Sequence, residues 1–150
     1  MTRKEVAVNF RKEAVEKLRY YKLKKYSLQV AMEEYNRLGD EMAALHAASD
    51  GDRVTGGEGD REAVLISLIE KRDALSMAIK NTRTWIRVVD KAMAALGDDD
   101  RLILNTLYVE KTNGGINHLC ERLFVEKTTV YRRRDRAIRE FTIAMYGTEK

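Results

Sequence analysis

Apolar residues recur at helical spacing along two long segments of the chain, and a polar break separates these segments. In residues 3–48 they hold two positions of a heptad repeat, with one row at Leu28, Tyr35 and Met42 and another at Ala31, Leu38 and Leu45. In residues 61–96 the corresponding rows are Leu65, Ile79, Ile86 and Met93, and Leu68, Leu75, Val89 and Leu96. Paired rows of this kind are typical of helices that pack along one another. The pattern predicts two long amphipathic helices, of which the first is either continuous or broken near residues 25–27.

The polar break at residues 49–60, SDGDRVTGGEGD, is rich in glycine and aspartate, which oppose both helix and strand. We expect an exposed loop without a nucleotide site, because the glycine run lacks the Gly-Lys-Ser/Thr ending of a phosphate-binding loop. The two long helices are expected to pack as a coiled-coil-like antiparallel helical hairpin, since neither buries its apolar rows alone. The same rows could instead pair between two chains, which leaves a homo-oligomer through the long helices open.

The last third of the chain carries short apolar stripes and frequent breaks. Gly97 fits the C-cap of the second long helix, and Asp98 fits the N-cap of a helix at residues 99–109. Two stripes follow, at Ile116, Leu119, Cys120 and Leu123, and then at Val130, Ala137 and Phe141. Two short helices joined by a tight turn and buttressed by a third predict a helix-turn-helix domain. The predicted architecture is therefore all-α, with a helical hairpin at 1–96 and a three-helix domain at 97–150.

Basic and hydroxyl side chains crowd the second of the two short helices, which is typical of a helix that reads duplex DNA. With Glu126 at the N-cap, the helix begins at Lys127, and the first turns of such a helix lie nearest the base edges. The residues expected to contact bases are Lys127, Thr128, Tyr131 and Arg132. Those expected to contact phosphates, which position the protein without specifying sequence, are Thr129, Arg133 and Arg136. The alternative is a charged, solvent-facing helix on a protein-binding module.

Three positions test the fit to a helix-turn-helix. A small residue is needed midway along the first helix, where the second crosses closely, and Cys120 stands there. A β-branched apolar residue is needed early in the second helix, and Val130 supplies it. The turn usually holds a glycine with left-handed backbone geometry, but here it holds Phe124. We expect either a turn of different shape or a Phe124 side chain that faces the core.

Composition and charge favour an acidic partner inside the cell. The formal net charge is +4 and the pI is near 9.2, which is compatible with nucleic-acid binding. Basic residues within 3–25 form either a solvated helix face or a second contact to the DNA backbone. A single cysteine, no recognisable signal peptide and no long apolar run favour a cytoplasmic protein without a membrane span.

Nothing in the pattern of reactive side chains indicates an enzyme. His46 and His118 do not belong to any recognisable metal-ligand or catalytic spacing, and Cys120 is expected to be buried. The three aspartates at 98–100 fit the first turn of a helix better than a cation site, because no other ligand-type cluster accompanies them. We therefore expect no catalytic site, no metal and no cofactor.

The segment RLILNTLYVEKTNGGINHLCERLFVEKTTVYRRRDRAIREF, residues 101–141, resembles region 4 of sigma factors, which reads the promoter −35 element. It is more closely similar to phage-encoded late transcription regulators of the RinA and ArpU kind, which join a helical N-terminal part to a sigma-region-4-like end. The matching features are Arg101 to Tyr108, the stripe from Ile116 to Leu123, Thr129-Val130, Arg133 and Arg136-Ala137. The resemblance implies promoter binding and contact with RNA polymerase in a bacterial cell.

Two residues depart from the pattern of these regulators. Glu126 stands where serine is frequent, so the helix cap must come from a carboxylate. Arg134 stands where leucine is frequent, so we expect that position to be more exposed. No segment resembles the part of a sigma factor that melts the promoter, so an accessory activator is expected rather than a complete sigma factor.

The sequence thus predicts a sequence-specific DNA-binding transcription regulator, encoded by a phage or prophage, that reads a promoter element with the helix at 127–139. A small terminase subunit that recognises a packaging site is the alternative within the DNA-binding class. A helical scaffold or adaptor that binds protein is the alternative from another class. Salt dependence separates the DNA-binding class from the protein-binding scaffold, because several phosphate contacts make the affinity for DNA fall steeply as salt is raised.

Overall fold

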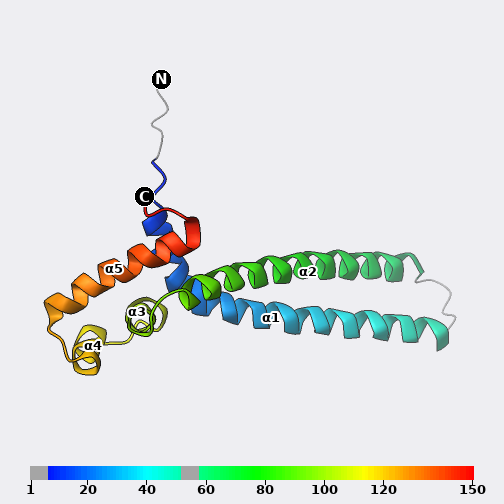
Figure 1. Ribbon diagram of the computed structural model, residues 1–150. Coiled ribbons are helices and arrows are strands. Elements are labelled where there is room, and N and C mark those ends of the chain that lie inside the picture. Colours follow the sequence, from blue (N-terminus) through cyan, green and yellow to red (C-terminus); the bar gives the residue numbers. More distant parts are fainter. Residues whose placement is uncertain (1–6, 52–57) are drawn as a thin grey trace, which may run out of the picture. The chain divides into compact units, whose positions relative to one another are not determined.

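Helices make up nearly all of the chain that the structure describes, a computed structural model of residues 7–51 and 58–150 (Figure 1). The elements are α1 (Phe10–Gly51), α2 (Glu58–Ala94), α3 (Asp98–Leu104), the π-helical turn η1 (Asn105–Val109), α4 (Gly115–Leu123) and α5 (Lys127–Tyr146). No β-strand occurs in these two ranges, which confirms the all-α prediction. None of the helices within them combines the length and the apolar character needed to cross a membrane.

The first long helix runs without interruption through residues 25–27, so the continuous alternative is confirmed. The prediction that it begins near Arg3 is wrong for residues 7–9, which are not helical. The side-chain Oδ1 of Asn9 accepts a hydrogen bond from the backbone N–H of Lys12 at 3.0 Å. A short polar side chain at this position satisfies a backbone N–H that the helix itself leaves unpaired, so the helix begins at Phe10.

The predicted loop at residues 49–60 is partly helical at both ends. The first long helix continues to Gly51, and the second begins at Glu58 instead of Arg61. A formed helix gains one backbone hydrogen bond for each residue added, which lets it extend into residues of low helix propensity. The centre of the predicted loop, residues 52–57, lies outside the described residues.

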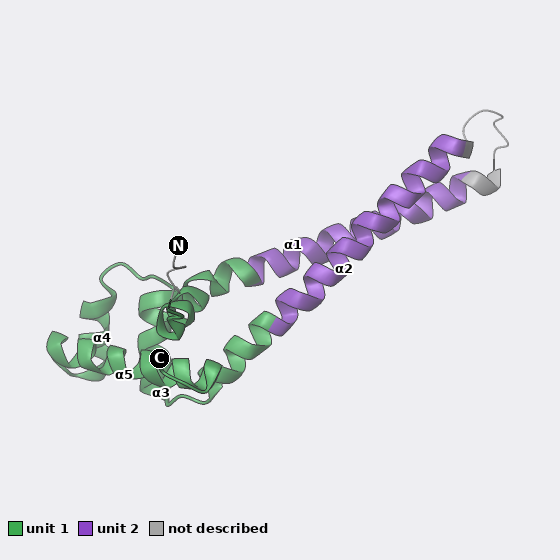
Figure 2. Ribbon diagram, turned by 90° about the horizontal axis from the view of Figure 1, so that it is seen from above, with its two compact units in different colours: residues 1–24, 85–150 green, residues 25–84 purple. Residues whose placement is uncertain are grey.

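Residues 25–84 form one of two compact units, in which α1 packs against α2 (Figure 2). The buried apolar side chains of this unit are Leu38, Leu68 and Ile79, all from the predicted heptad rows. The remaining row members in this range are only half-buried. The unit is therefore held by a narrow apolar seam between the two helices.

Arg72, which interrupts one heptad row, packs into this seam. Its guanidinium carbon lies 4.0 Å from the centre of the Tyr35 ring, and its Nε donates a hydrogen bond to the Tyr35 carbonyl oxygen at 3.3 Å. A Cβ atom built on Gly39 would lie 2.7 Å from Arg72 Nη2. Glycine at position 39 therefore provides the space that the guanidinium occupies.

The second compact unit consists of residues 1–24 and 85–150 (Figure 2). Its larger core brings together buried side chains from α1, α2, α3 and α5 and from the turn between α2 and α3, namely Ala14, Leu18, Val89, Ala92, Leu96, Leu104, Ala137, Ile138 and Phe141. The C-terminal helix thus packs on the first turns of α1 and the last turns of α2. The predicted domain boundary between residues 96 and 97 stays a prediction.

Basic residues near the start of α1 contact other elements of this same unit. Lys17 Nζ lies 4.9 Å from the centre of the Tyr146 ring, and Lys24 Nζ lies 5.6 Å from that of Trp85. These two lysines occupy heptad positions where the apolar row thins, so their alkyl stems continue the row while their charges rest on aromatic rings. Other such contacts join Arg11 to Asp135, Arg19 to Tyr108 and Lys22 to Glu110.

A smaller core in the same unit is formed by Ile103, Leu119 and Val130, which come from α3, α4 and α5. The π-helical turn η1 links the two cores, since its Leu107 packs against the smaller core and its Tyr108 against the larger one. In η1 the backbone N–H of Glu110 donates to the carbonyl oxygen of Asn105 at 2.7 Å, a bond that spans five residues. A wider turn of this kind contains one extra residue and shifts the direction of the side chains that follow.

Candidate nucleic-acid interface

The two predicted stripes on the C-terminal helices both face the protein interior. Val130, Ala137 and Phe141 on α5 are fully buried, and so is Leu119 on α4. The other members of the α4 stripe, Ile116, Cys120 and Leu123, are partly buried and pack against the smaller core. The prediction that Cys120 is buried is therefore only partly met, because one side of this α4 position remains open to solvent.

The turn between α4 and α5 has the left-handed geometry that glycine usually supplies. Phe124 adopts it with φ 56° and ψ 46°, and its backbone N–H donates to the Cys120 carbonyl oxygen. Its side chain is 93% exposed. Both expectations for this residue are wrong, because the backbone keeps the usual shape and the ring faces away from the core.

The N-cap of α5 is Glu126, as predicted, with extended backbone geometry at φ −80° and ψ 162°. Its side chain makes no capping hydrogen bond, so the expectation of a carboxylate cap is wrong. The residues that cap helices well have short side chains that reach back to the first amides, and glutamate is longer by one methylene than aspartate. The first backbone amides of α5 therefore lack a cap from this side chain.

The predicted base-contacting residues lie on the first two turns of α5 and are open to solvent. The side chains of Lys127, Thr128 and Arg132 make no hydrogen bond or ion pair with any residue that the structure describes. Tyr131 is 43% exposed, and its ring lies 5.0 Å from the guanidinium carbon of Arg134. The Lys127 ammonium, the Thr128 hydroxyl and the Arg132 guanidinium are thus not bonded to any described residue.

The predicted phosphate contacts lie partly against the protein itself. Thr129 and Arg133 are half-buried, whereas Arg136 is exposed. Arg133 pairs with Asp99 at 3.7 Å, and Arg136 pairs with Asp100 at 3.6 Å. To reach a phosphate, either arginine would have to share or exchange its carboxylate partner.

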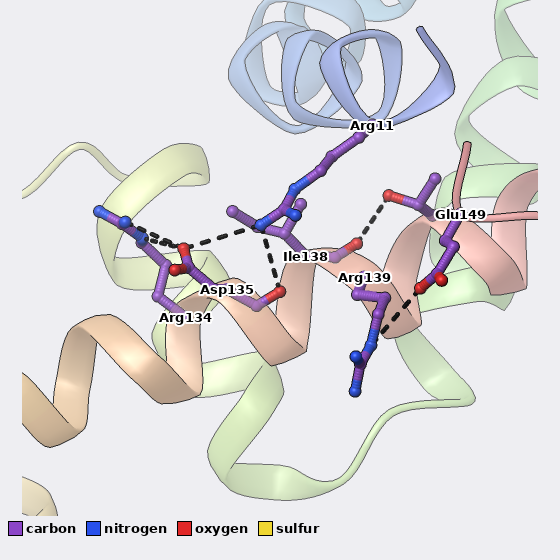
Figure 3. A network of polar contacts seen from close by, with 7 residues as sticks. Arg11, Arg134, Asp135, Ile138, Arg139 and Glu149 are labelled. Atoms are coloured by element: carbon purple, nitrogen blue, oxygen red, sulfur yellow. Dashed lines mark hydrogen bonds and ion pairs between the residues drawn. The ribbon is translucent and has the colours of Figure 1, made fainter.

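Later arginines of α5 are also paired (Figure 3). Arg134 donates two hydrogen bonds to the Asp135 carboxylate, the shorter at 2.9 Å, and its side chain is 30% exposed. The expected exposure of Arg134 is thus limited by this contact and by the Tyr131 ring. Arg139 pairs with Glu149 at 3.6 Å. The helix therefore divides into early polar residues without described partners and later arginines that carboxylates hold.

The aspartates at 98–100 form the first turn of α3 and also pair with arginines. Gly97, not Asp98, is the N-cap of α3, and Asp98 lies in the first turn, where it pairs with Arg101. Asp99 and Asp100 join α3 to α5 through the two arginine pairs described above. Asp100 is 6% exposed and its Oδ1 makes no hydrogen bond, because 3.6 Å exceeds hydrogen-bond length. Sequence reasoning missed this role, although the excess of arginines on α5 was a signal for it.

Positive charge gathers on α4 and α5. Residues 120–139 contain seven basic and three acidic side chains, a net excess of four. Residues 3–25, with nine basic and three acidic side chains, are a second basic segment of the chain. A polyanion would therefore be attracted to α4 and α5, as well as to residues 3–25.

Metal-ligand geometry is not found in the part of the chain that the structure describes, where no three His, Cys, Asp or Glu side chains gather as a candidate site.

In comparisons with protein families, with characterised proteins and with solved structures, no match to this chain was found.

Proposed function

We propose that this chain binds duplex DNA through a helix-turn-helix formed by α4 and α5, with residues 127–139 in the major groove. One observation carries the proposal. The early face of α5 holds exposed Lys127, Thr128 and Arg132 without described partners, directly above apolar residues that are fully buried. A rigid helix that exposes donors on its first turns has the form that base-edge readout requires.

Within this proposal, residues take two kinds of role. The base contacts are Lys127, Thr128, Tyr131 and Arg132, and the phosphate contacts are Thr129, Arg133 and Arg136. Ion pairs at solvent-exposed positions contribute little free energy, so Arg133 can exchange Asp99 for a phosphate at small cost. Arg136 faces a buried carboxylate and gives up more, which makes it the weaker of the two phosphate contacts.

The wider biological role is a transcription regulator of phage or prophage origin that acts on a promoter element in the bacterial cytoplasm. The resemblance of residues 101–141 to sigma region 4 supports this role, and it makes RNA polymerase a further partner. We also propose that α1 and α2 form an antiparallel helical hairpin. Two contacts support it, that of Tyr35 with Arg72 and that of Met32 with Arg83. Met32 precedes Tyr35 on α1, whereas its partner Arg83 follows Arg72 on α2, which is the order expected when two helices run in opposite directions.

Association of chains through the long helices is part of the same proposal. Side chains on α2 that the pair of helices leaves exposed include Ile66, Ile69 and Met77, at 50%, 41% and 60%. Their spacing of three and eight residues sets them on one side of the helix. The mass of the protein in solution, measured over a range of concentrations, tests association: a mass that stays at 17.3 kDa contradicts it.

Selection of bound duplexes from a random pool tests the main proposal. We expect an enriched sequence, and an affinity for it that falls by a factor of about 10³ or more between 50 and 200 mM salt if six or more phosphates are contacted. A shuffled duplex should bind more weakly and show the same salt dependence. No enrichment, together with no binding in dilute buffer, would overturn the proposal.

A further inference from the structure

Phe124 is the most exposed of the large hydrophobic side chains in the described part of the chain. It also has φ 56°, in the left-handed region that residues with a side chain rarely adopt. The backbone conformation is unfavourable and would be relieved by glycine. The ring gains nothing from folding, because it is almost as exposed to water as in an unfolded chain. The residue therefore strains the isolated fold and adds no packing to it.

The fold does not draw on the Phe124 ring in return. The neighbours on either side, Leu123 and Val125, pack against the core formed by Ile103, Leu119 and Val130, so they anchor the turn. The backbone N–H of Phe124 caps α4, and a glycine would make the same bond. The ring is thus available to a partner that approaches the turn from outside.

The position of the ring along the chain indicates which partner this is. Phe124 precedes Lys127 by three residues, so their Cα atoms lie within about 11 Å of each other. Lys127 and Thr128, the residues of α5 proposed to lie nearest the bases, have no described partners. Among the described residues, the first long helix contacts α5 farther along, between Asp135 and Tyr146. A body that meets the start of α5 would therefore meet Phe124 as well.

We propose that Phe124 is a DNA-contacting residue that packs its ring on the methyl group of a thymine at the edge of the bound site. Phenylalanine is among the side chains that make apolar contact with this methyl group in the major groove. The positive charge of residues 120–139 favours a polyanionic partner over an apolar protein surface. The inference rests on the proposed function and adds to it a specificity-determining residue outside α5.

The test is the substitution Phe124→Gly, for which stability and binding should change in opposite directions. The melting temperature should rise by about 2–4 °C, because the backbone strain at this position is removed. Affinity for the selected duplex should fall roughly fivefold to tenfold, since the apolar contact is lost. Phe124→Asn, which tolerates the left-handed region but is polar, should lose affinity in the same way.

Replacement of single thymines by uracil identifies the contact. At one thymine the wild-type chain should lose affinity on removal of the methyl group, and Phe124→Gly should lose nothing further there. Tyr26→Ala, a change at another large and highly exposed side chain in residues 25–84, should leave melting and binding unchanged.

The outcomes separate this inference from the proposed function. If the wild-type chain binds no duplex, both the proposed function and the inference about Phe124 fail. If the wild type binds and Phe124→Gly binds equally well, only the inference fails. It fails likewise if the loss of affinity is independent of every thymine, as with a contact to protein or to the sugar backbone, or if Phe124→Gly lowers the melting temperature.

Discussion

At the scale of single residues, the arginines of α5 differ in what surrounds them more than in their chemistry. Arg133, Arg134, Arg136 and Arg139 each lie within 4 Å of a carboxylate oxygen. Arg132 makes no such contact with any described residue, and it occupies the exposed second turn. A guanidinium without a competing carboxylate can offer its full set of donors to a guanine edge.

We predict that Arg132→Ala weakens binding to the selected duplex by about 1–3 kcal/mol and relaxes preference at one base position. The measurement is a titration of the selected duplex and of duplexes changed at each position. Arg139→Ala, at an arginine that Glu149 already engages, is the matched control and should have a smaller effect. An equal loss on every duplex would reassign Arg132 to a phosphate.

Gly39 and Arg72 give a second prediction at this scale. Glycine to alanine inside a helix usually stabilises by about 1 kcal/mol. Here the new methyl group would meet the Arg72 guanidinium, which would have to leave the Tyr35 ring and carbonyl oxygen. Gly39→Ala should therefore lower the melting temperature by about 1–4 °C.

The control for this prediction is the same change in a chain that carries Arg72→Ala. With the guanidinium absent, Gly39→Ala should raise the melting temperature by about 2–4 °C. Circular dichroism at the helical wavelength follows both transitions. A rise of equal size in both backgrounds would show that Arg72 does not occupy the space beside Gly39.

At the scale of elements, α3 holds α5 through charge as well as through apolar packing. Asp100 is nearly fully buried, and Arg136 supplies the only cation within 4 Å of it among the described residues. A buried carboxylate that loses its cationic partner is destabilising, since no hydrogen bond from a described residue compensates its Oδ1.

Arg136→Ala is accordingly predicted to lower the free energy of unfolding by about 1–3 kcal/mol in the absence of DNA. Adding Asp100→Asn to the same chain should recover part of the loss, because the buried charge is removed. Arg132→Ala, whose side chain has no described partner, should leave stability unchanged. Chemical denaturation measures all of these chains. If Arg136→Ala is neutral, the ion pair contributes nothing and Arg136 remains a phosphate contact alone.

Periodicity was sufficient to predict the α-helical segments and the faces they bury, but not the π-helical turn at Asn105–Val109, which lies within the single helix expected at residues 99–109. The heptad rows, the α4 stripe and Val130 all face the interior because spacing along a helix is a local property of the sequence. Contacts between distant elements left no such signal. Lys17 reads as a polar interruption of its row until Tyr146, more than a hundred residues later, is brought over it. The sequence was therefore enough to predict that one side of α5 is polar. It was not enough to predict which arginines on that helix pair with carboxylates and which do not.

At the scale of the whole molecule, the two compact units differ in how much apolar surface they bury. Among the described residues, only Leu38, Leu68 and Ile79 are buried hydrophobic side chains within 25–84. The other unit contains two cores with contributions from five helices. Segments with few buried contacts open at lower free energy than segments in a large core.

We expect backbone amides near Leu38 and Leu68 to exchange hydrogen at least about tenfold faster than those near Leu104 and Phe141. Hydrogen exchange followed by mass spectrometry resolves the two regions. The association state should be held fixed at low protein concentration, because pairing of chains through the long helices would protect residues 25–84. Equal protection of both regions would mean that the chain opens in a single step.

The extra residue in η1 has a consequence for engineering this chain. Each α-helical residue turns the chain by about 100°, so a single deletion between Asn105 and Val109 would rotate everything downstream by that amount. That angle sets the direction in which the proposed DNA-binding side of the C-terminal helices faces. Grafting residues 98–146 onto another scaffold should therefore preserve the length of this turn even where its side chains are changed.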